Sequence, residues 1–162
     1  MTLNEVSSLA EIAASLAVVF SLFYLAIQVR QSNVLSRAQT RQSMMQLGQD
    51  ELFLEVAHPD LVTAFTKESI SEEERVKLNA WLTAAMRARE YEWFAHRDGV
   101  VDTPMFQSYV GVIPILLGTE RSRKWWDAHR DINEFDSEFV KFVDRVLEQP
   151  PVAGYWEAWN KW

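Results

Sequence analysis

The chain of 162 residues contains no cysteine, which excludes disulfide bonds, thiolate metal sites and cysteine nucleophiles. Its five glycines and five prolines are too few for the many turns of a β sandwich. Acidic residues outnumber basic ones: the chain has 16 Lys and Arg and 23 Asp and Glu, which gives a formal net charge of −7. This charge opposes the attraction to phosphates that drives nucleic-acid binding. We therefore expect an all-α protein that does not bind nucleic acid.

The sequence also lacks the usual catalytic motifs. It has no G-x-S-x-G elbow, no glycine-rich phosphate loop and no H-E-x-x-H motif. We expect no enzyme activity, no catalytic residue, no cofactor and no bound metal.

One polar cluster could have a chemical role: Glu90, Glu92 and His96, in the segment "REYEWFAHRD". Glu92 and His96 lie one helical turn apart, where a carboxylate and an imidazole could hold a metal or transfer a proton. A metal site between helices needs three or four converging ligands, however. The neighbouring Arg87, Arg89 and Arg97 favour ion pairs that fix helix packing. A membrane-bound enzyme or metal-binding protein using Glu90, Glu92 and His96 is therefore the alternative reading.

A run of eighteen residues, "IAASLAVVFSLFYLAIQV" from residue 12 to 29, has no charge, glycine or proline. With the two residues before Glu11 it makes a helix of roughly 30 Å, the thickness of a bilayer's hydrocarbon core. A secretory signal needs basic residues ahead of the run, where this chain has only Glu5 and Glu11. A buried core helix is the other alternative. We expect a transmembrane span over residues 9–29 that exposes Ile12, Leu16, Val19, Phe20, Phe23, Tyr24 and Ile27 to lipid.

The residues after the run set the expected orientation. Arg30, Arg37 and Arg41 follow it, whereas no Lys or Arg precedes it. Because basic residues stay on the cytoplasmic side, we expect a single-pass protein of the bacterial inner membrane with its N-terminus outside. The transmembrane segment then covers residues 1–29, and a soluble, cytoplasmic multi-helix bundle covers residues 30–162.

The first helix is expected to continue from the membrane to about Ala57, since no proline interrupts it. Beyond the span it carries a heptad seam, defined by alternating steps of three and four residues: Leu35, Ala38, Gln42, Met45, Gln49, Leu52 and Val56. Gln42 and Gln49 either pair across an oligomer interface or lie partly exposed beside the other helices of the same chain. Further helix starts are predicted at Pro59, Ser71, Thr103, Pro114, Thr119 and Asp136, from N-cap and first-turn preferences.

Two tryptophan-rich segments are candidate contact surfaces. Trp125 and Trp126 follow three basic residues, an order suited to lipid headgroups or to a partner. The C-terminal tail carries Tyr155, Trp156, Trp159 and Trp162. Tryptophan anchors many protein interfaces. Three alternatives are open for this tail: it packs on the chain's own core, on a partner or on lipid. With Arg30, Arg37 and Arg41, these aromatic residues are the expected partner or lipid contacts.

The segments "FYLAIQVRQSN", "YEWFAHRDG" and "RKWWD" resemble an uncharacterised bacterial family in which one transmembrane helix precedes a small α-helical domain. The resemblance implies this architecture and the inner membrane, and it assigns no residue a chemical role because the family has no established activity. We expect a non-catalytic, membrane-anchored scaffold or accessory subunit of a larger membrane protein complex. Its expected partners are membrane lipid and either other subunits or copies of itself. A self-assembling, lipid-surface-binding module is a further alternative.

Overall fold

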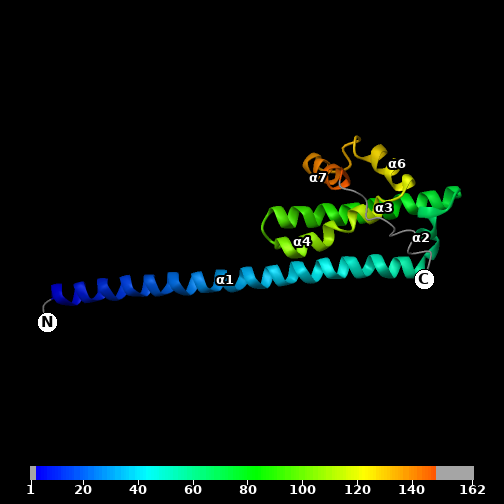
Figure 1. Ribbon diagram of the computed structural model, residues 1–162. Helices are drawn as coiled ribbons and strands as arrows, with labels where there is room; N and C mark the ends of the chain where they lie inside the picture. Colours follow the sequence, from blue (N-terminus) through cyan, green and yellow to red (C-terminus); the bar gives the residue numbers. More distant parts are fainter. Residues whose placement is uncertain (1–2, 149–162) are drawn as a thin grey trace. The chain divides into compact units, whose positions relative to one another are not determined.

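The computed structural model describes residues 3–148, and all the regular elements in this range are helices (Figure 1). They are α1 (Leu3–Ala57), α2 (Pro59–Thr66), α3 (Glu72–Arg97), α4 (Thr103–Val110), α5 (Ile113–Leu116), α6 (Glu120–His129) and α7 (Ser137–Glu148). The prediction of an all-α fold with one long apolar N-terminal helix is confirmed. The chain divides into two compact units, residues 1–42 and 43–162, so α1 begins in the first and ends in the second.

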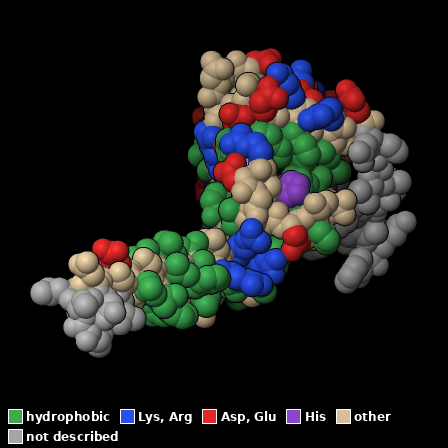
Figure 2. All heavy atoms as spheres, turned by 90° about the vertical axis from the view of Figure 1, so that its left-hand side faces the viewer, with side chains coloured by type: hydrophobic (Ala, Val, Ile, Leu, Met, Phe, Trp, Pro, Cys, Tyr) green, Lys and Arg blue, Asp and Glu red, His purple; other side chains and the backbone are tan. Residues whose placement is uncertain are grey.

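Within the first unit, the apolar run makes α1 long and apolar enough to cross a membrane. Its side chains are exposed from Ile12 to Val29, and they form the hydrophobic band of Figure 2, which a group of basic side chains follows. Two serines in the helix satisfy their hydroxyl groups internally. Ser15 Oγ donates to the backbone oxygen of Glu11, and Ser21 Oγ donates to that of Ala17. Their polar groups therefore add little to the cost of placing the helix in an apolar medium.

The helix boundaries of the second unit follow local chemistry. Pro59 stands in the first turn of α2, where its missing N–H would have no helical partner. Ser71 and Glu74 form a reciprocal capping box at the start of α3. Gly99 follows the C-cap of α3 with φ of 70°, a left-handed conformation that glycine adopts without strain. The two helix starts predicted at Pro59 and Ser71 are confirmed.

The later helices confirm most of the remaining predictions and correct one. The N-cap of α4 is Asp102 and not Thr103, because the Asp102 carboxylate accepts the backbone N–H of Met105. Thr119 caps α6 as predicted. Asp136 likewise caps α7, accepting the N–H of Phe139 at 3.2 Å. The restart predicted at Pro114 is α5, which carries this proline in its first turn.

Helix α3 is the centre of the second unit, with α2 and α4 packed against it and α5 packed against both α3 and α7. The largest group of buried side chains joins α2, α3, α5, α6 and α7. Helix α7 contributes one apolar stripe, in which Phe139, Val143 and Val146 are buried. The Arg121 guanidinium ties α6 to the end of α2 by donating to the backbone oxygens of Ala64, Lys67 and Glu68. Ala64 lies in the last turn of α2, where backbone oxygens lack a partner within the helix, and Lys67 and Glu68 directly follow the helix. The arginine therefore satisfies a helix end.

Candidate functional site

The last part of α1, from residue 43 onward, belongs to the second unit and packs against the rest of that unit through one face. Met44 is fully buried, and Gly48, Glu51 and Glu55 are partly buried at steps of four, three and four residues. This spacing places the four residues on one side of a helix. Two of the four are acidic, so α1 brings carboxylates and not only apolar side chains to the packed face.

The heptad seam is a different face of the same helix. Leu35, Met45, Leu52 and Val56 are 61%, 60%, 62% and 80% exposed, and Gln42 and Gln49 are exposed as well. Large apolar side chains that stay exposed in regular spacing are typical of a helix that packs on another helix. The exposure of the two glutamines fits both alternatives, pairing across an oligomer interface and partial exposure beside the chain's other helices.

A buried charge cluster connects α1 to α3. Arg89, on α3, is 4% exposed and lies between two glutamates. Its Nη2 is 3.3 Å from a carboxylate oxygen of Glu51 on α1, and its Nε is 3.0 Å from Oε2 of Glu92 on α3. Glu92 is 1% exposed, and neither of its oxygens accepts a hydrogen bond among the described residues. Arg89 is therefore shared by two carboxylates, one of them almost completely removed from water.

Burial determines the protonation of these acids. Burial raises the pKa of Glu92 to about 7, with Glu51 adding to the rise and Arg89 opposing it. Burial also raises the pKa of Glu51, which Arg89 again opposes, and it raises the pKa of Glu55, whose neighbour Glu51 adds a like charge. Desolvation disfavours the charged form of each carboxyl group, and one arginine does not compensate for three of them. The pKa of Tyr109 is raised mainly by burial too.

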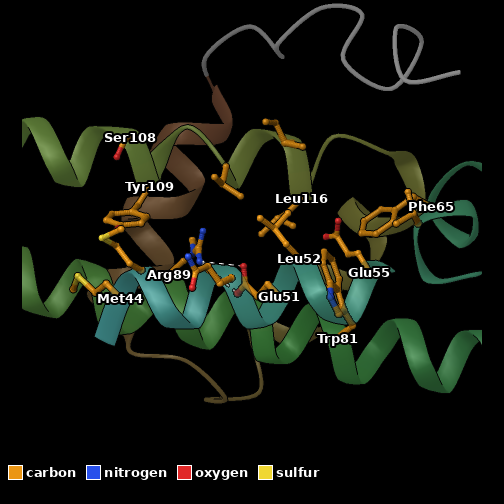
Figure 3. A pocket seen from close by; sticks show the side chains of 16 residues that line it. Met44, Glu51, Leu52, Glu55, Phe65, Trp81, Arg89, Ser108, Tyr109 and Leu116 are labelled. Carbon is orange, nitrogen blue, oxygen red and sulfur yellow. Dashed lines mark hydrogen bonds and ion pairs between the residues drawn. The ribbon is translucent and has the colours of Figure 1, made fainter. Parts of the chain in front are cut away.

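Beside this cluster is a cavity of about 510 Å³, which we call the α1 cavity (Figure 3). Glu51, Glu55 and Arg89 supply its charged lining, with Gln49, Ser108 and Tyr109 as further polar groups. Figure 3 shows Met44, Tyr109 and Arg89 toward one end of the cavity and Glu55, Phe65 and Trp81 toward the other. The rest of the wall is apolar and comes from α1, α2 and the α4 to α5 region, including Met45, Leu52, Val62, Val112, Ile115 and Leu116. An apolar cavity with a few converging polar groups has the general character of a small-molecule site.

The structure places the three residues of the candidate polar cluster in different surroundings. Glu92 turns to Arg89, as described above. Glu90 is 2.8 Å from Nη1 of Arg87 and accepts the backbone N–H of Asp136 at 2.6 Å. His96 Nδ1 is 3.1 Å from the backbone oxygen of Val101. The imidazole ring stacks on the ring of Phe106, with the two centroids 4.2 Å apart. The predicted ion pairs with Arg87 and Arg89 are confirmed, whereas Arg97 pairs with Asp98. The three side chains share no common site.

Metal ligation has no support in the part of the chain from residue 3 to 148. Within it, no group of three or more His, Cys, Asp or Glu side chains is arranged to hold a metal ion.

The candidate contact residues divide into four groups. Trp126 is 1% exposed, and its Nε1–H donates to Asp144 at 3.0 Å. The prediction that Trp126 is a surface contact is therefore wrong, because its ring is part of the core. Trp125 is half-buried and donates to Asn79 at 2.8 Å. Arg30, Arg37 and Arg41 are exposed on α1 within the first unit. Tyr155, Trp156, Trp159 and Trp162 lie outside the described residues.

Sequence reasoning missed Glu51, Glu55 and Arg89 as one group. A local signal existed for part of it, since Glu51 and Glu55 are one helical turn apart and share a face with Met44. Arg89 lies 38 positions after Glu51, and no local pattern connects them. Comparison of the chain with models of protein families, with curated proteins and with solved structures finds no match, so the resemblance to a bacterial membrane-anchored family stays a prediction.

Proposed function

We propose that the chain is a non-catalytic, membrane-anchored accessory subunit that docks onto other membrane proteins through α1. The observation that carries the proposal is the exposure of large apolar side chains along this helix. In the apolar run, Phe20 and Phe23 are 70% and 68% exposed. In the second unit, Leu52, Phe53 and Val56 are also exposed, well beyond the length that a bilayer accommodates. Lipid accounts for the first group, and a protein partner accounts for the second.

The membrane in this proposal is the bacterial inner membrane, with the second unit in the cytoplasm. Arg30, Arg37 and Arg41 support this orientation through the excess of basic residues on the cytoplasmic side. A fluorescent protein fused to the C-terminus should then be active, whereas a periplasm-dependent phosphatase fused there should be inactive. The opposite pair of results would refute the orientation and leave the docking proposal standing.

Docking through the seam side of α1 is tested by photo-crosslinking in native membranes. A photoreactive phenylalanine analogue at Phe53, which is 70% exposed, should give a crosslinked product of higher mass that is identified as a membrane protein by mass spectrometry. The matched control is the same analogue at Tyr91, an exposed aromatic residue on α3. Equal crosslinking at both positions indicates random collision.

Mass in detergent gives a second, independent test. The protein extracted from its native membrane should elute well above 18.8 kDa plus the micelle. A strictly monomeric particle in several mild detergents, combined with no product at Phe53, would refute the docking function. A crosslinked product that contains only copies of this chain would indicate a homo-oligomer and not an accessory subunit of another complex.

A further inference from the structure

The α1 cavity has the chemistry of a binding site for a small organic cation, which goes beyond the docking function. Its volume of about 510 Å³ falls within the roughly 300 to 1,000 Å³ typical of small-molecule sites. Gly48 contributes to this space, since a Cβ atom built at that position would meet no heavy atom within 4 Å. The absence of a side chain at Gly48 therefore leaves part of the cavity empty.

The charges around the cavity favour a positive ligand. Glu51, Glu55 and Arg89 line it, and Glu92, which is not part of the lining, pairs with Arg89, so three carboxylates accompany one guanidinium. Arg89 is engaged by Glu51 and Glu92. Among the described residues, Glu55 makes no hydrogen bond or ion pair with a basic side chain. A cation next to Glu55 would compensate this charge, whereas an anion would be repelled.

The walls near Glu55 favour an organic cation over a metal ion. Phe65 and Trp81 form an edge-to-face pair with ring centroids 5.4 Å apart and planes at 87°, and aromatic rings attract ammonium groups. Trp81 is 6% exposed, and its Nε1–H has no acceptor among the described residues. Hard metal ions need six or more oxygen ligands or a fixed carboxylate cage, which these aromatic and aliphatic walls do not provide.

We propose that the α1 cavity binds a small ammonium compound with an apolar body, its charged group beside Glu55 and Glu51 and its apolar part against Met45, Leu52 and Leu116. Met45 and Leu52, which belong to the exposed seam, also line this cavity.

The test uses three probes of similar size and different charge: phenylbutylammonium, phenylbutanol and phenylbutyrate. Binding to the full-length chain in neutral detergent is measured by isothermal titration calorimetry, with empty micelles as the blank. We expect the ammonium probe to bind at least about tenfold more tightly than the alcohol, and the carboxylate probe to bind more weakly than either. Equal affinity for the three probes, or no binding of the ammonium probe, would overturn the proposal.

Two variants and a control separate charge from space. Glu55→Gln should remove the preference for the ammonium probe over the alcohol. Gly48→Leu should weaken both probes by filling the cavity while keeping the helix, because leucine has the higher helix propensity. Glu72→Gln, which changes an exposed acid at the start of α3, should leave all affinities unchanged. Circular dichroism verifies that each variant is folded, and an unaltered ammonium affinity in folded Glu55→Gln would refute the assignment of the charge.

Discussion

Replacement of Glu92 by glutamine tests the electrostatics of the buried cluster directly. The Glu92 side chain is 1% exposed, and burial raises its pKa from 4.5 to about 7. Because the folded state binds this proton more tightly than the unfolded state, the contribution of Glu92 to stability is complete below pH 4.5. It is lost progressively as the pH rises toward 7. Ionised Glu92 therefore makes the folded chain less stable at pH 8 than at pH 5.

The size of the effect follows from the same two values. One pH unit corresponds to about 1.4 kcal/mol, so the interval between 4.5 and 7 amounts to about 3 kcal/mol. Glutamine keeps the shape of Glu92 without a charge, and Arg89 retains Glu51 as a partner. Glu92→Gln should therefore be more stable than the original chain at pH 8, by up to about 3 kcal/mol, and nearly equal to it at pH 5.

Thermal unfolding of the full-length chain in neutral detergent, followed by circular dichroism, measures this difference. At pH 8 we expect the midpoint of Glu92→Gln to rise by roughly 5 to 10 °C. Glu90→Gln is the matched control, because Glu90 is also buried but has two partners, Arg87 and the N–H of Asp136. It should lower the midpoint at both pH values. A Glu92→Gln chain less stable than the original at pH 8 would show that the ion pair with Arg89 outweighs desolvation, and would refute the reasoning.

Four further substitutions test the fold and the anchor. Ser71→Ala should cost about 1 kcal/mol by removing the N-cap of α3, measured by thermal unfolding against Ser69→Ala. Arg121→Ala should cost about 2 kcal/mol, since it frees the carbonyls at the end of α2, and an unchanged midpoint would contradict that role. Phe139→Ala should cost about 3 to 5 kcal/mol because the ring is fully buried. Phe20→Arg places a charge within the apolar run at a cost of about 3 kcal/mol, so membrane fractionation should show a smaller inserted fraction. Full insertion of this variant would argue against the span.

Local chemistry made most helix boundaries predictable. A capping side chain acts within one turn of its own position, so Ser71, Thr119 and Asp136 could be identified without tertiary information. Helix α4 begins at Thr103 as predicted, but its N-cap was misassigned by one residue because two residues with capping side chains, Asp102 and Thr103, stand together ahead of a proline. Proline is compatible with either choice, and the Asp102 carboxylate takes the role by accepting the N–H of Met105.

The packed face of α1 was not predictable from periodicity. The heptad seam and the packed face differ by one position along the helix, as Met45 and Met44 illustrate. Hydrophobic spacing favours the seam, because Leu52 and Val56 are more apolar than Glu51 and Glu55. Only the distant Arg89 distinguishes the two faces, and a contact across 38 positions leaves no signal in local sequence.

Arg89 gives a physical reason for the choice between these faces. A step of one residue turns a helix by about 100°, so a rotation that buried Leu52 and Val56 would carry Glu51 away from the arginine. Burial of those two side chains would contribute about 2 kcal/mol each. It would leave a buried guanidinium with Glu92 alone, and breaking a buried ion pair costs about 3 to 5 kcal/mol. The two effects are similar in size, so the charge cluster offsets what the apolar seam would gain inside the chain. The seam then remains available to another molecule, which connects the buried cluster to the docking role of α1.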